Sequence, residues 1–283
     1  MKEVTVFQQK QEMERLSTQE DLFSPYEQPV YEKVLAQPRR FILDIGTNDG
    51  RKTVRRFSAS SMQKTIGLEC NAELVQNARN HCTDSRFFFY HLDVEDSSFV
   101  PHVREIMKSQ QIPAFDVIHL SFVLMHLREP AALLEKLKPL LAPEGVLMVM
   151  DVNDELSALT PDQECRFSQF KYFLQLDPCA GDRTCAKKLP KLLEQLGYRN
   201  ITMERETLAA PPEETQKKQS MFEVFCSYLQ DDMELLRRQD AECLDYIRCE
   251  NWLNRNYEAL RKDVLSGDTA FSLGVSIIVC TGA

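Results

Sequence analysis

The chain has 283 residues, of which 43% are hydrophobic, 9% aromatic and 27% charged, and its formal net charge is −9. This composition is typical of a globular protein with one large domain and excludes wholesale disorder. It contains no run of about 18 apolar residues, which excludes a membrane span, and Met1–Leu16 lacks the apolar stretch of a signal peptide. The acidic balance disfavours nucleic acid as a partner, because the phosphate backbone would repel the chain.

Cysteine usage favours a reducing compartment. The nine cysteines are odd in number and form no CxxC pair, so we expect free thiols in a cytoplasmic protein. Cys179 and Cys185 flank a predicted loop. Neither a second cysteine pair nor a nearby histidine completes a metal site there, so we expect no metal.

The first two-thirds of the chain alternate between strand and helix patterns. The first 35 residues are predicted to be helical, broken near Ser24-Pro25, and we treat residues 1–36 as an N-terminal cap. Five short apolar runs then predict strands, at 40–46, 65–70, 86–92, 115–121 and 145–152. Helical periodicity separates them, at about 50–58, 71–82, 97–110 and 126–141. This order predicts an α/β fold with a doubly wound parallel sheet in a core over residues 37–205.

The pattern changes after residue 152. We expect a helix over 161–176, a loop over 177–183, a helix over 189–196 and a sixth strand over 198–205. Residues 206–269 are predicted to form about three helices inserted before a last strand at 271–280, within the segment 270–283. The insertion is interpreted as a lid over an acceptor pocket, as the surface of a homodimer or as a stabilising cap. Its stripe of Phe222, Phe225 and Leu229 is interpreted as core packing.

A glycine-containing turn, Asp44–Gly50 (DIGTNDG), directly follows the first predicted strand. Gly46 and Gly50 allow the backbone to turn sharply and to approach a ligand closely. Asn48 stands where a third glycine is usual, and Asn is among the few residues that tolerate positive φ. Asp44 is expected at the end of the strand, where it can accept hydrogen bonds from an amine-bearing ligand. A plain strand-to-helix turn is the alternative.

Two carboxylates follow the next two strands. Glu69 ends the second strand, where a carboxylate can accept both ribose hydroxyls of a nucleoside. Asp93 follows the third strand, where it can accept the exocyclic amine of adenine. A helix cap is the alternative for each. It is weaker for Glu69, because this residue interrupts an apolar strand at the expected ligand crevice.

Together these residues resemble the class I S-adenosylmethionine-dependent methyltransferases over about residues 26–205. The glycine-rich motif of that family corresponds to Asp44–Gly50, its ribose-binding acid to Glu69 and its adenine-contacting acid to Asp93. Its fourth-strand segment matches residues 115–126 (FDVIHLSFVLMH), and its turn before the fifth strand matches residues 141–145 (LAPEG).

The resemblance implies a Rossmann-like, seven-stranded sheet whose last strand is antiparallel. It implies S-adenosylmethionine as cofactor, S-adenosylhomocysteine as product, and methyl transfer by in-line displacement. The residues expected around the cofactor are Asp44, Gly46, Thr47, Asn48, Gly50, Glu69, Cys70, Asp93, Val94, Ser121 and Phe122.

Two other functions compete with this interpretation. A nicotinamide-dependent oxidoreductase shares the crevice and the ribose acid, but the fingerprint here is not GxGxxG and no Tyr has a Lys four positions later. A non-catalytic cofactor-binding protein, with the insertion as a partner surface, is the alternative from another class.

Residues after the fourth and fifth strands are candidates for the acceptor side. His126, expected to open a helix, is a candidate general base or orienting residue, and a local hydrogen-bonding role is the alternative. Asp151 and Asn153 end the fifth strand, and a simple loop turn is their alternative. Arg183 follows Asp182 in a polar loop, where it can clamp a charged substrate group or form a surface ion pair. We expect a small-molecule acceptor.

Overall fold

The computed structural model describes residues 10–282, and the chain divides into two compact units. The sheet unit comprises Glu27–Val152, Cys185–Arg205 and the residues from Ser276 onward. The helical unit comprises Asn153–Thr184, Glu206–Val275 and the described residues before Glu27.

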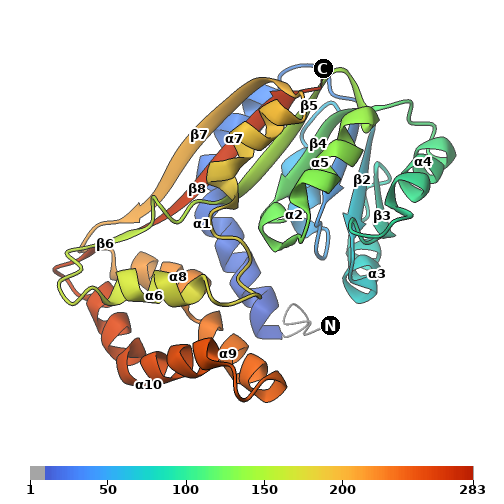
Figure 1. Ribbon diagram of the computed structural model, residues 1–283. Helices are drawn as coiled ribbons and strands as arrows, with labels where there is room; N and C mark the ends of the chain where they lie inside the picture. The colour runs from blue at the N-terminus through green and yellow to red at the C-terminus, as the bar shows by residue number, and fades with distance from the viewer. Residues whose placement is uncertain (1–9, 283) are drawn as a thin grey trace. The chain divides into compact units, whose positions relative to one another are not determined.

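The sheet unit is built on a mostly parallel sheet with the order β3-β2-β1-β4-β5-β8, and β7 pairs with β8 (Figure 1). Strands β1 to β5 pair in parallel, and β1 is buried at every residue. Burial on both faces explains the apolar runs that predict these strands. The strand bounds are β1 Phe41–Ile45, β2 Lys64–Glu69, β3 Phe87–His91, β4 Phe115–Ser121, β5 Leu141–Val152, β7 Arg199–Ala210 and β8 Ala270–Thr281.

Short helices connect these strands. α3 packs against β2 and β3 and α7 packs against β5, and apolar side chains from the sheet and these helices form one core. The Asn71 side chain caps α3 by accepting from the N–H groups of Glu73 and Leu74. The helix bounds are α1 Lys10–Leu35, α2 Arg51–Phe57, α3 Ala72–His81, α4 Phe99–Ser109, α5 Pro130–Leu137 and α7 Cys185–Gln195.

In the helical unit, α10 packs against α6, α8 and α9 (Figure 1). Phe222, Phe225 and Leu229 are buried, which confirms that their stripe is core packing. The described bounds are β6 Ala158–Thr160, α6 Arg166–Leu174, α8 Thr215–Cys226, α9 Tyr228–Gln239 and α10 Leu244–Leu265. The chain passes between the units within α1, β7 and β8, and also after Val152 and after Thr184.

The predicted α/β class and the Rossmann-like strand order with one antiparallel strand are confirmed. The sheet has eight strands rather than seven, because β6 pairs antiparallel with the first residues of β8. At three residues β6 is too short for its side-chain pattern to predict it. None of the described helices is long and apolar enough to cross a bilayer.

The prediction of a break near Ser24-Pro25 was wrong, since α1 runs unbroken through Pro25 and Pro29. Each proline removes one backbone donor, at a cost of about 3 kcal/mol in a helix interior. In the sheet unit, the α1 side chains of Val30, Tyr31 and Val34 are buried. Burial of such side chains contributes about 1.5–3 kcal/mol each, which offsets the loss. Residues 1–9 of the predicted cap lie outside the described residues.

Three helix starts also differ from the prediction. α6 begins at Arg166 instead of residue 161, because Asp162 accepts the N–H groups of Phe167 and Ser168 and so caps the helix later. The single helix expected over 126–141 is divided into the 3₁₀ helix η2 (Leu124–His126), α5 and the 3₁₀ helix η3 (Lys138–Leu140). Helix α7 begins at Cys185.

Candidate functional site

The turn between β1 and α2 has the backbone geometry that its glycines require. Gly46 and Gly50 both adopt φ of 77°, and Asn48 adopts φ of 51°. The N–H of Gly46 donates to the carbonyl of Leu68 at the end of β2, which holds the turn against the neighbouring strand. The left-handed residues are the ones singled out from sequence, so local chemistry explains the turn.

Close packing around the turn leaves no room for larger side chains. A Cβ on Gly46 would lie 2.5 Å from Val123 Cγ2, and one on Gly50 would lie 2.7 Å from Phe89 Cζ. Thr47 is 3% exposed, and its Oγ1 is a buried oxygen with no hydrogen-bond partner among the described residues. A buried hydroxyl without a partner carries a desolvation cost, which a ligand group can relieve.

Glu69 connects the turn to the end of β2. Its Oε2 accepts the N–H of Asn48 at 3.0 Å, and its Oε1 accepts the N–H of Asn71 at 3.0 Å and the thiol of Cys70 at 3.3 Å. The side chain that caps α3 is Asn71, so Glu69 is not the helix cap that the alternative supposed. Each carboxylate oxygen has two lone pairs, so Glu69 retains acceptor capacity beyond these bonds.

Asp93 lies exposed, two residues beyond the end of β3. Its Oδ1 accepts the N–H of Glu95, whereas the N–H of Ser98 at the start of α4 is accepted by Asp96. The helix-cap alternative for Asp93 was therefore wrong. Val94, next to it, is buried.

A buried polar network lies behind the turn. Asp44, 2% exposed, accepts hydrogen bonds from His119 Nδ1 at 2.6 Å and from Thr53 Oγ1 at 2.5 Å. The Tyr31 hydroxyl is 2.7 Å from His119 Nε2, so the chain of contacts runs from α1 through β4 to β1. Burial by itself would raise the pKa of Asp44, but His119, Arg56 and Thr53 together lower it below its usual value.

Both Asp44 oxygens therefore already have protein partners, and a ligand amine would be an additional donor. Sequence reasoning did not single out His119 or Thr53. The signal for His119 is a histidine in the middle of an apolar strand, where an ionisable side chain needs a buried partner.

A second buried ion pair borders the end of β4. Arg56 on α2 donates to Glu27 on α1 at 3.0 and 3.2 Å and to Ser121 Oγ at 3.5 Å. Phe122, the next residue, is half-buried and adopts φ of 55°, a left-handed conformation that is rare for a bulky side chain. Ser121 and Phe122 thus lie in a constrained backbone at the carboxyl end of the sheet.

The acceptor-side candidates in the sheet unit have different environments. Asp151 is fully buried, and it accepts the N–H groups of Met125 and Val152, so it fixes η2 to the end of β5. His126 is exposed at the end of η2. The expectation that His126 opens the next helix was wrong, because α5 begins at Pro130.

Asn153 and Arg183 belong to the helical unit. The N–H of Asn153 donates to the carbonyl of Gly274 at 2.9 Å. Arg183 forms a bidentate pair with Asp154, with both distances 2.9 Å and side chains 8% and 6% exposed. The surface-pair alternative was therefore wrong: Arg183 is buried, and Asp182 instead accepts the N–H and hydroxyl of Thr184.

The comparisons with known proteins agree with this geometry. The family model described as a methyltransferase domain matches residues 19–203, well over half of the chain. Among curated proteins, no sequence matches this chain.

Several solved structures share the fold at low sequence identity. Phosphoethanolamine N-methyltransferase 2 of Haemonchus contortus, solved with S-adenosyl-L-methionine, is 12% identical over 94% of this chain and 56% of that one, with a TM-score of 0.52. One chain of a complex that contains the Haloferax volcanii Trm112 methyltransferase activator is 13% identical to this chain. The match covers 96% of this chain and 97% of that one, with a TM-score of 0.51. Cyclopropane synthase MmaA2 of Mycobacterium tuberculosis is 12% identical over 89% and 83%, with a TM-score of 0.50. At these identities the likeness concerns the fold.

Proposed function

The chain belongs to the methyltransferase-domain family, and from that premise we propose that it is an S-adenosylmethionine-dependent methyltransferase acting on a small-molecule acceptor. The observation that carries the proposal is the Gly46–Gly50 turn, whose Asn48 amide is bonded to Glu69 at the end of the next strand. In open α/β sheets, ligands bind in the crevice at the carboxyl ends of the strands.

The residues present fit such a cofactor. Thr47 Oγ1 is a buried oxygen without a partner among the described residues, and the turn packs too tightly for side chains at Gly46 or Gly50. Glu69 is proposed to accept the ribose hydroxyls, and Asp93 the adenine amine. Cys70 and Val94 would flank the adenosine of the cofactor. Asp44, which lies behind the turn, would orient the amino acid end of the cofactor.

When bound, S-adenosylmethionine supplies a methyl group already activated by the positive charge on sulfur. What this chain must do is align the acceptor, exclude water and leave the reaction path open. Ser121 and Phe122, held by the left-handed backbone after β4, are proposed to border the transferred group. Exposed His126 is proposed to take a proton from acceptors that must lose one, or to orient the acceptor.

The proposal of a small-molecule acceptor is based on the net charge of the chain. The formal net charge of −9 disfavours nucleic acid. Asp151, near the end of β5 in the sheet unit, is proposed to shape the acceptor side. Because Arg183 is already held by Asp154, its contribution would be to fix the loop rather than to clamp a free carboxylate. We also propose a cytoplasmic location, which the free cysteines favour, and a homodimer formed through the 206–269 segment.

Calorimetric titration of the purified chain with S-adenosylmethionine, S-adenosylhomocysteine and NAD tests the cofactor. We expect binding of the first two only, and a weakening of about 10- to 100-fold in Glu69→Gln, because hydrogen bonds to a charged group contribute about 1.5–3 kcal/mol. Glu73→Gln, an exposed acid on α3, is the matched control. Binding of NAD alone would point to an oxidoreductase and defeat the proposal.

A second measurement separates an enzyme from a non-catalytic binder. The chain is incubated with S-adenosylmethionine and pooled small-molecule acceptors, and S-adenosylhomocysteine formation is measured. Turnover with any acceptor supports the enzyme. Tight cofactor binding without turnover across acceptor classes supports a binding protein that uses its helical unit as a partner surface.

A further inference from the structure

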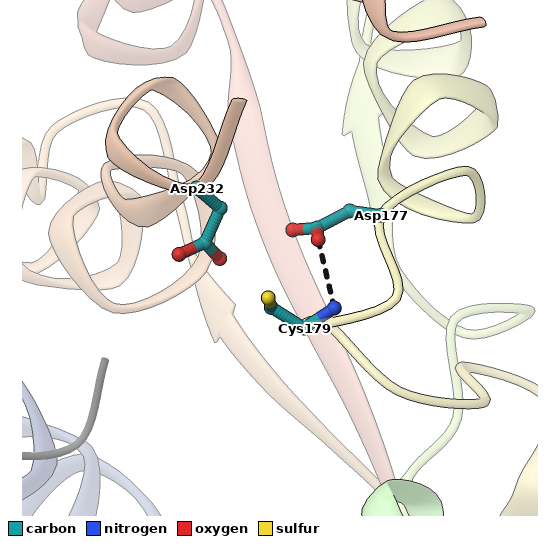
Figure 2. Close-up of side chains that lie close together, drawn as sticks. All are labelled: Asp177, Cys179 and Asp232. Atoms are coloured by element: carbon teal, nitrogen blue, oxygen red, sulfur yellow. Dashed lines mark hydrogen bonds between the residues drawn. The ribbon is translucent and has the colours of Figure 1, made fainter. Parts of the chain in front are cut away.

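A cluster of potential metal ligands lies in the helical unit, outside the turn and the strand ends described above, and it includes Cys179, where the sequence alone predicts no metal. Asp177 and Cys179 lie in the loop after α6, and Asp232 lies on α9, 53 residues beyond Cys179 in sequence. The three ligand atoms all lie within 4.8 Å of one another. Figure 2 shows the three side chains facing a common point.

Burial makes this cluster different from ordinary surface acids. Asp177 is 1% exposed and Asp232 is 2% exposed. Asp177 Oδ1 accepts the N–H of Cys179 at 2.8 Å, which fixes the carboxylate within the loop (Figure 2). Asp177 Oδ2 is buried without a hydrogen-bond partner among the described residues, and it points into the cluster. A buried carboxylate oxygen in this position requires a proton or a cation.

We propose that Asp177, Cys179 and Asp232 bind a zinc ion, which ties the loop after α6 to helix α9. Two carboxylate oxygens and one thiolate are ligands that zinc takes in proteins, and three protein ligands leave a fourth position for water. Zn–O and Zn–S bonds of about 2.1 and 2.3 Å place tetrahedral ligand atoms about 3.4–3.6 Å apart. The ligand atoms, which lie within 4.8 Å of one another, would therefore need to approach by at most about 1.4 Å to reach these distances.

The electrostatics of the metal-free site agree with this assignment. Burial raises the pKa of Asp177, and burial together with Asp177 and Asp232 raises the pKa of Cys179 to about 12. A bound zinc ion would offset the negative charge that burial of these side chains disfavours.

The competing state is a pair of carboxyl groups that share one proton. The two states predict different effects of zinc on the melting temperature. Zinc raises the melting temperature of the wild-type chain only if it binds the folded site. In the proton-sharing state, zinc leaves that temperature unchanged, and Asp232→Asn supplies a neutral donor in place of the shared proton.

The test uses the full chain, stripped of metal with a chelator and titrated with zinc alone. We expect one zinc per chain, a higher melting temperature, and an affinity at least about 100-fold weaker in Cys179→Ser and Asp232→Asn, because losing even a partner of a ligand costs about 10- to 100-fold. Cys165→Ser, which alters an exposed thiol outside the cluster, is the matched control. Circular dichroism of each metal-free variant verifies that it folds.

Cobalt provides a spectroscopic readout that does not depend on stability. Wild-type chain loaded with Co²⁺ should show a thiolate-to-metal charge-transfer band that Cys179→Ser lacks and Cys165→Ser keeps. Equal zinc affinity in wild type and Cys179→Ser, a band that survives this substitution, or zinc binding without any change in melting temperature would each overturn the proposal.

Discussion

Gly46→Ala tests the close packing of the turn after β1. Alanine at a φ of 77° costs about 1–2 kcal/mol, because its Cβ approaches the following carbonyl oxygen. The new Cβ would also lie 2.5 Å from Val123 Cγ2, and overpacking of this kind costs about 1–3 kcal/mol. The unfolded state of the alanine variant has lower conformational entropy, which stabilises the fold by about 0.4–1 kcal/mol and offsets part of this loss. We therefore expect the free energy of unfolding to fall by about 1–5 kcal/mol.

Urea unfolding measured by circular dichroism is the appropriate assay. The single tryptophan, Trp252, lies on α10 in the helical unit, so its fluorescence would not report on the sheet unit that contains Gly46. Gly267→Ala is the matched control. A Cβ there would meet no atom within 4 Å, and we expect the free energy of unfolding to stay unchanged or to rise by up to about 1 kcal/mol.

A double-mutant cycle separates the steric cost from the backbone cost. Val123→Ala removes the clashing Cγ2, so adding it to Gly46→Ala should restore about 1–3 kcal/mol relative to the sum of the single changes. The backbone cost should remain. If Gly46→Ala is no less stable than Gly267→Ala, or if the two changes are additive, the described contact between the turn and Val123 is wrong.

Two further predictions concern buried ion pairs. Because the pKa of Asp44 is lowered in the folded chain, its ionised form stabilises the fold above the unfolded pKa of about 3.9, and this stability is lost as the pH falls through the folded pKa. Urea midpoints measured from pH 6 to pH 2 should fall less steeply in Asp44→Asn, and an unchanged slope would contradict the assignment. Arg183→Ala should reduce the free energy of unfolding by about 3–5 kcal/mol, because it leaves Asp154 charged and buried. Replacing both residues with apolar ones should cost less than Arg183→Ala alone, and an equal or larger cost in calorimetry would contradict the pairing.

The positions of the buried strands and the turn after β1 could be predicted from the sequence, because both depend on local chemistry, whereas the arrangement of the strands in the sheet followed only from the family resemblance. Strands buried on both faces require continuous apolar runs, such as Phe41–Ile45. A left-handed backbone requires glycine or asparagine, which the chain places at Gly46, Asn48 and Gly50. The position of Glu69 at the end of β2 could also be predicted, because a charged residue at the end of an apolar strand has few structural reasons to be there.

The partners of the buried charged groups were decided only by the tertiary structure. His119 meets Asp44 from 75 residues away, and Arg183 meets Asp154 from 29 residues away. Such pairs leave no spacing pattern in the sequence, because each forms only when separate elements pack and exclude water from between the two charges. Burial likewise keeps α1 helical through Pro25, where the local preference of proline predicts a break.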